Sequence, residues 1–245
     1  MAMPAIQGCI ERRILVNFRV EPAALARVLP APFRPLTIGG FGVGGICLIR
    51  LGAVRPRGWP ARLGVGSENA AHRIAVEWDE GGQRREGVYI PRRDTDSNLN
   101  ALLGGRFFPG VHHRADFTVD ETPPLFRVAL RSRDDATAVS VVARIAEKVP
   151  AGSVFPSLEA ASTFFLNGCL GYSPDAGGAC FEGLELRCAT WSMEPLAVEA
   201  VHSSFFADAA AFPAGTVAFD SAFLMRDIEH EWVARGGIAA ESAAR

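Results

Sequence analysis

Lysine is nearly absent from this sequence, because Lys148 is the only lysine among 25 lysine and arginine residues. Almost every positive charge is therefore a guanidinium, which does not lose its proton at ordinary pH. Chemistry that needs a free amine has a single candidate in the chain. Lys148 shares strand parity with Ser140 and Arg144 rather than with apolar neighbours, which predicts a solvent-facing position.

Other absences exclude broad classes of protein. No uninterrupted apolar run approaches the roughly 20 residues that a membrane-spanning helix requires. A net charge of -2 and a pI of about 6.2 do not provide the clustered positive charge that nucleic-acid binding needs. The five cysteines form no C-x-x-C pair, and no charged region with an apolar core opens the chain. We therefore expect a soluble, reduced, cytoplasmic protein with neither a nucleic-acid nor a membrane partner.

Several motifs with a defined chemistry are also missing or misplaced. The chain has no G-x-S-x-G elbow and no H-E-x-x-H, which argues against serine hydrolases and zincins. Residues 40–45 match the dinucleotide fingerprint, but residues 46–50 have a strand pattern where a helix should follow, so we predict a glycine-rich turn or bulge. His112 and His113 are adjacent, and on a strand they would point to opposite faces instead of sharing a metal ion. We predict no metal and no cofactor.

Period-two patterns dominate the chain and predict strands. Apolar residues alternate from Ile10 to Val20, as expected for a half-buried strand. Further strands are predicted at 72–78, 126–133, 137–149, 184–191, 196–202 and 216–225. Helices are few: one opens at Pro22, and others cover 96–103 and 157–167, the last with Ser157 as N-cap. His72 and His202 share the parity of apolar neighbours, which predicts partly buried, hydrogen-bonded side chains.

This order of elements predicts the fold class. The strands are not interleaved with regular helices, which argues against a doubly wound parallel sheet. We predict a β-dominated α+β protein with a closed or sandwiched antiparallel sheet. A chain of 245 residues fits one domain. We place this domain at residues 1–237, followed by a frayed tail at 238–245.

The most informative stretch is 105–114. It resembles the Gly-Arg-Glu-x-x-Gly-x-Pro-Lys-Lys signature of acetoacetate decarboxylases, of which this chain keeps Gly105, Arg106 and Gly110. In ungapped register His113 falls on the family's Schiff-base lysine and Arg114 on its cationic neighbour. Phe107 replaces the family's glutamate, and His112 replaces its proline.

Two earlier passages agree with this resemblance. Residues 25–35 are similar to the family's helix-to-turn passage, and residues 67–70 lie where a Tyr-x-Glu-Ala-like strand would be, so Glu68 is the counterpart of an active-site carboxylate. The chain looks closest to the branch of this superfamily that lacks the catalytic lysine pair. The resemblance implies a cone-shaped antiparallel β-barrel or sandwich with a few short helices, a buried pocket and a homo-oligomer.

Two functions follow from the resemblance as hypotheses. Imidazole cannot form an imine with a keto acid, so lysine-dependent decarboxylation is not expected. The first hypothesis is a lyase- or hydratase-type enzyme for a small keto or hydroxy acid, with His113 as general acid/base and Glu68 orienting it or sharing its proton. Arg106 or Arg114 would then hold the carboxylate or enolate.

The alternative is a non-catalytic binding protein with the same pocket. Phe107, Phe108 and Val111 would line it and accept a small apolar or acidic ligand. Arg93 is a further binding candidate, because its region approaches the pocket in the family. Structural interpretations stay open beside these: a salt bridge for Arg106, a solvated strand end for residues 113–114 and a solvated turn around Arg93.

Overall fold

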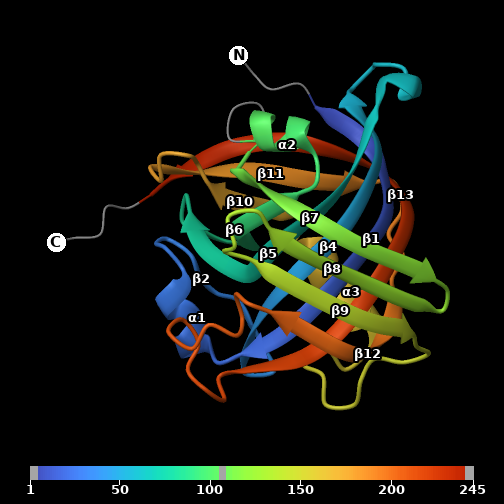
Figure 1. Ribbon diagram of the computed structural model, residues 1–245. Coiled ribbons are helices and arrows are strands. Elements are labelled where there is room, and N and C mark those ends of the chain that lie inside the picture. Colours follow the sequence, from blue (N-terminus) through green and yellow to red (C-terminus); the bar gives the residue numbers. More distant parts are fainter. Residues whose placement is uncertain (1–4, 105–108, 241–245) are drawn as a thin grey trace.

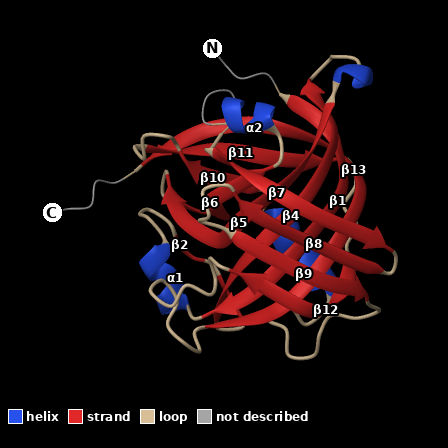
Figure 2. Cartoon of the chain, viewed as in Figure 1, coloured by secondary structure: helices blue, strands red, loops and turns tan. Residues whose placement is uncertain are grey.

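The computed structural model describes residues 5–104 and 109–240, and strands dominate this part of the chain (Figure 1). The strands are β1 (Ile6–Val20), β2 (Arg34–Pro35), β3 (Thr37–Ile38), β4 (Phe41–Pro56), β5 (Val65–Glu80), β6 (Gln83–Thr95), β7 (His112–Thr122), β8 (Leu125–Ser132), β9 (Ala138–Ile145), β10 (Leu170–Pro174), β11 (Cys180–Cys188), β12 (Glu194–Ser203) and β13 (Val217–Ala239). The helices are α1 (Pro22–Val28), α2 (Asn98–Leu103) and α3 (Leu158–Asn167), with a 3-10 turn η1 (Ala61–Leu63). Figure 2 shows how little helix accompanies the strands, which confirms the predicted fold class.

The strands close into two rings that share a wall. The larger ring runs β1-β4-β5-β6-β7-β8-β9-β12-β13, and the smaller one runs β1-β4-β5-β6-β10-β11-β13. The shared wall is therefore β13-β1-β4-β5-β6. Most neighbours are antiparallel, as predicted, but β6 pairs in parallel with both β7 and β10. These two parallel pairs mark the place where the rings divide.

Both faces of the shared wall are buried. On β1, Ile14 and Val16 point into the larger ring, while Leu15 points into the smaller one, and all three side chains are fully buried. The prediction of a half-buried strand at this position was wrong. Alternation gave one apolar face correctly, but the second face is also covered, because the smaller ring closes over it.

The local signals for helix ends were correct. The Ser157 hydroxyl accepts a hydrogen bond from the Ala160 N–H at 3.1 Å, which confirms Ser157 as the N-cap of α3. Ser97 caps α2 in the same way, through the Asn100 N–H at 3.2 Å. Helix α3 packs Ala161 and Phe165 against the smaller ring's side of the wall. It thereby covers one end of that ring.

The glycine-rich segment 40–45 forms a turn and then the start of β4. Gly40 has a φ of 85°, which only glycine adopts readily, and the later glycines lie inside the strand. A Cβ on Gly44 would lie 2.6 Å from the Phe206 ring. The motif is thus explained by close packing inside a sheet.

Two boundaries differ from the sequence-based expectation. Strand β13 continues to Ala239, which pairs with Cys180, so the sheet includes two residues that we had placed in a C-terminal tail. Lys148 is exposed as expected, but it lies beyond the end of β9 and not within a strand. No helix in the described ranges is long and apolar enough to cross a membrane.

Candidate functional site

A cavity of about 80 Å³ lies inside the smaller ring. Each buried water needs about 10–15 Å³ of such space, so the cavity can hold several waters or a small organic molecule. Its walls are mainly apolar, and polar groups enter from a few positions. The apolar wall includes Ile49, Leu51, Val54, Leu184 and Trp232; the polar residues are Asn69, Arg93, Asp94, Asn100 and His112, of which Asp94 is bonded to Arg92.

Arg93 and His112 lie side by side because β6 and β7 run parallel. The two residues are partners in the register of these strands and point to the same face. Arg93 donates a hydrogen bond from Nε to the Ser173 hydroxyl at 3.0 Å. Among the described residues no carboxylate forms an ion pair with Arg93, although Glu182 is near enough to influence it. Burial lowers the pKa of Arg93 to about 10, so the side chain remains a cation at neutral pH.

The hydrogen bonding of His112 fixes its tautomer. Its Nδ1 lies 3.1 Å from the Gly110 carbonyl oxygen, which can only accept, so Nδ1 carries the proton. Nε2 is then the atom left to accept a proton or a hydrogen bond. Burial and the neighbouring Arg93 charge lower the pKa of His112 to about 3, so the imidazole is neutral.

Two glycines make room for this arrangement. A Cβ on Gly104 would overlap Nδ1 of His112. Gly110 has a φ of 79°, and a Cβ there would lie 2.7 Å from the Ser173 side chain and 3.1 Å from Nε of Arg93. The Gly110 N–H also donates to the Glu182 carboxylate at 2.8 Å. This hydrogen bond ties the segment before β7 to Glu182 of β11. The segment can lie this close to Arg93 because position 110 has no Cβ.

Glu68 and His113 lie on the opposite face from these residues. Successive side chains on a strand alternate, so Asn69 and His112 point into the cavity while their neighbours point into the larger ring. Glu68 is bonded to Arg12 and, at 2.6 Å, to Nε of Arg50. Glu121 pairs with the same two arginines at 3.2 and 3.3 Å. Glu68 is therefore part of a four-residue charge network.

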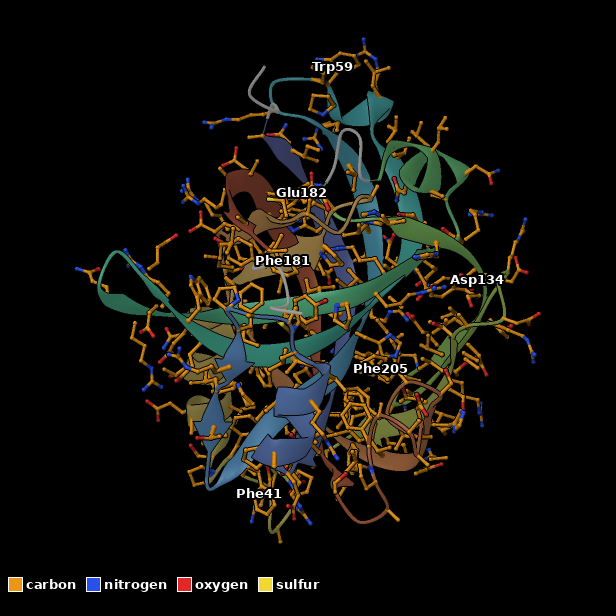
Figure 3. All side chains as sticks on the ribbon, turned by 90° about the vertical axis from the view of Figure 1, so that its left-hand side faces the viewer. Phe41, Trp59, Asp134, Phe181, Glu182 and Phe205 are labelled. Atoms are coloured by element: carbon orange, nitrogen blue, oxygen red, sulfur yellow. The ribbon has the colours of Figure 1, made fainter. Side chains whose placement is uncertain are left out.

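His113 has its own partner. Its Nδ1 lies 3.2 Å from the Asp134 carboxylate, which also accepts from Arg92 at 2.9 Å. In Figure 3, Asp134 lies toward the right-hand edge of the molecule, and Glu182 lies well apart from it in the upper part of the view. His113 is not among the residues that line the cavity. It does not pair with Glu68 as expected, because His113 contacts Asp134 while Glu68 contacts Arg12 and Arg50.

The remaining sequence-based candidates divide in the same way. Arg93 lines the cavity, whereas Arg114 donates to the Thr95 carbonyl oxygen at 3.3 Å and is not among its lining residues. Val111 is 36% exposed. Arg106 and Phe107 lie outside the described residues, as does Phe108.

Sequence reasoning missed His112, Asn69 and Asn100 as cavity residues. Alignment with the family signature located the right segments of chain. In each segment it selected the residue next to the one that lines the cavity: Glu68 instead of Asn69, and His113 instead of His112. The alternation that argued against a shared metal at residues 112–113 was the available signal, since it showed that only one of the two histidines could face a given pocket.

Glu68→Gln tests whether Glu68 is structural. The variant should lower the free energy of unfolding by about 2 kcal/mol, because the buried Arg12 loses a charged partner while Glu121 remains. Ligand binding in the cavity should not change, since Glu68 faces the other ring. Urea unfolding measures the first effect and calorimetric titration the second; loss of binding at unchanged stability would place Glu68 in the site.

Comparison with known proteins agrees with this architecture. The fold is that of acetoacetate decarboxylase-like proteins. An acetoacetate decarboxylase-like enzyme from Sphingomonas wittichii RW1 superposes with a TM-score of 0.59 at 12% identity, covering 98% of this chain and 94% of that one. Acetoacetate decarboxylase from Legionella pneumophila gives a TM-score of 0.60 at 13% identity, covering 98% and 88%. The enduracididine biosynthesis enzyme MppR, solved with pyruvate, gives 0.60 at 14% identity, covering 98% and 91%.

Residues 10–223 match the DUF2071 family, described as an uncharacterized conserved protein, and the chain belongs to this family. No curated protein matches the sequence significantly. At these low identities the structural likeness establishes the fold alone.

Proposed function

We propose that this chain binds a small 2-oxo or 2-hydroxy carboxylic acid inside the smaller ring, with the carboxylate on Arg93. One observation carries the proposal: Arg93 and His112 converge on an apolar-walled cavity, and Arg93 has no ion-paired acid among the described residues. A guanidinium held partly out of water without an anion is costly, and a bound carboxylate would supply the missing partner through charge-assisted hydrogen bonds.

The reaction that this site supports is proton transfer at the carbon next to the carbonyl. His112 has Nδ1 protonated by its bond to Gly110, so Nε2 can take a proton from C3 of a 2-oxo acid and return it. The electron pair of the broken C–H bond moves into the enolate, whose negative charge lies beside the Arg93 cation. Such a step is common to lyases and hydratases.

An imine mechanism is not part of this proposal. Lys148 is the only lysine, and it is exposed beyond β9, away from the smaller ring's interior. Borohydride reduction in the presence of 2-oxopentanoate is therefore expected to add no mass to the protein at the cavity.

A second function, binding without catalysis, is favoured by one observation. The pKa of His112 is lowered to about 3 by burial and by Arg93, which makes its imidazole a weak base while the cavity is empty. A carboxylate bound to Arg93 would offset that cation. Deuterium exchange at C3 of 2-oxopentanoate in D₂O, followed by NMR, separates the two: exchange that is lost in His112→Asn indicates an enzyme, and binding without exchange indicates a binding protein.

Arg93→Met tests the binding proposal. The wild type should be stabilised by about 2.7 kcal/mol when 2-oxopentanoate is present at 100 times its dissociation constant, a shift of several degrees in Tm. The variant should lose this shift, yet its own Tm should not fall, because methionine removes a partly buried charge that has no ion-pair partner among the described residues. Arg133→Met, which removes an exposed arginine paired with Asp116, is the matched control and should keep the ligand effect. An unchanged ligand shift in Arg93→Met would refute the proposal.

A further inference from the structure

The cavity continues into a second compartment of about 90 Å³ inside the same ring. The two compartments share wall residues, so they adjoin rather than lie apart; the shared residues are Ile49, Ala71, Arg93, Leu184 and Trp232. The second compartment also contains Arg13, Cys47 and Arg73. It therefore has a different charge from the first.

The strand register explains why these arginines meet. On the smaller ring's side of the wall, Cys47 of β4 is paired with Ala71 of β5, and Ala71 is paired with Arg93 of β6. Arg73 is two residues along β5 from Ala71, and thus on the same face. Arg13 enters from β1, next to β4, and its Nε donates to the Cys47 sulfur at 3.1 Å. Guanidiniums from three strands thus surround one patch of sheet.

Arg13 and Arg73 retain unused hydrogen-bonding atoms. Arg73 is 4% exposed; it donates to the Asn17 amide oxygen and lies over the Phe165 ring at 4.8 Å, but its Nε has no partner. Nη1 of Arg13 is also buried without a partner. Within residues 5–104 and 109–240, no carboxylate forms an ion pair with either side chain.

Three guanidiniums therefore line the two compartments, and the one acidic residue among the lining residues, Asp94, is bonded to Arg92. Burial lowers the pKa of Arg73 to about 10, and the nearby Arg13 cation contributes to this, so both remain charged near neutral pH. One buried cation, Arg73, beside two partly buried ones, Arg13 and Arg93, is expensive to keep without an ion-paired acid. One bound carboxylate at Arg93 leaves Arg13 and Arg73 uncompensated.

We propose that the ligand is a dicarboxylic acid that spans both compartments. Its first carboxylate binds Arg93 beside His112, and its second binds the free atoms of Arg13 and Arg73. This inference rests on the proposed function, because it assigns the second half of the same ligand. Neighbouring strands are about 4.8 Å apart, so groups over β4 and over β6 are about 10 Å apart before the side chains bend inward, which suits a short diacid.

A matched pair of ligands tests the inference. 2-Oxoglutarate and 2-oxopentanoate have the same carbon chain, but only the first carries a second carboxylate. Calorimetric titration of the wild type should show 2-oxoglutarate binding roughly ten- to a hundredfold more tightly, as expected for one more charge-assisted contact. Arg13→Met should abolish this preference while 2-oxopentanoate binds as before, and Arg73→Met should do the same if the first variant does not fold.

The outcomes separate this inference from the proposed function. Equal affinities for the two acids in the wild type would overturn the diacid proposal and leave the Arg93 site intact. No binding of either acid would overturn both. A third outcome is that the wild type shows no preference for 2-oxoglutarate and the Cys47→Ser variant does. The Cys47 sulfur would then already satisfy Arg13 in the wild type, and this result would also contradict the proposal.

Discussion

Replacing Gly45 with alanine is expected to lower the free energy of unfolding by about 3 kcal/mol. Gly45 lies on the shared wall between Asn17 of β1 and Arg73 of β5, and a Cβ there would overlap the Val16 backbone oxygen. It would also lie 3.2 Å from the Arg73 guanidinium and 3.3 Å from the Asn17 amide oxygen. The strand is paired on both sides, so the backbone cannot move away cheaply.

The same substitution should affect binding. Arg73 reaches Asn17 across the space that Gly45 leaves, so a methyl group displaces the guanidinium from the second compartment. Gly236→Ala is the control, because a Cβ at Gly236 in β13 meets nothing within 4 Å. Urea unfolding of both variants measures the difference. A Gly45→Ala protein as stable as Gly236→Ala would contradict the packing of the shared wall.

Acidification from pH 7 to pH 5 is expected to remove about 6 kcal/mol of stability. Burial lowers the pKa of His72 and of His230 to about 4, and burial with the Arg93 charge lowers that of His112 to about 3. In the unfolded chain each histidine titrates near 6.5. Between these values the unfolded state takes up protons and the folded state does not, so stability falls as the pH falls. Each histidine contributes about 2 kcal/mol over this range.

Variants identify the groups responsible. His72 forms the predicted hydrogen bond, with Nε2 3.2 Å from the Ser203 hydroxyl, but it is fully buried where partial burial was predicted. His72→Gln should reduce the slope of stability against pH by about one third. His202, which was also predicted to be partly buried, is exposed, and that prediction was wrong. His202→Gln is therefore the control and should leave the slope unchanged. A stability that is flat between pH 7 and pH 5 would show that these histidines are not buried as described.

The sequence predicted the strands and helix ends well because those signals are local. Alternation marked β1, and Ser157 marked the start of α3. Which face of a strand lines a cavity is not a local property. It depends on β11 pairing with β13 and on β10 pairing with β6, which close the smaller ring over a second face of the wall.

This long-range closure explains the misplaced site residues. A family register locates Glu68 and His113 along the chain, but a shift of one position moves a side chain to the other ring. Arg13 and Arg73 were missed for the same reason, since a charged residue opposite an apolar face normally indicates solvent. Leu15, an apolar residue on the same strand face as Arg13, was the one hint in the sequence that this face is covered, and it is fully buried in the structure.

The most direct test is a crystal structure of the wild-type protein soaked with 2-oxopentanoate. We predict density for the acid inside the smaller ring, with its carboxylate on the Arg93 guanidinium and its C3 facing Nε2 of His112. An acid bound instead beside His113 and Asp134, with only solvent between Arg93 and His112, would contradict the account.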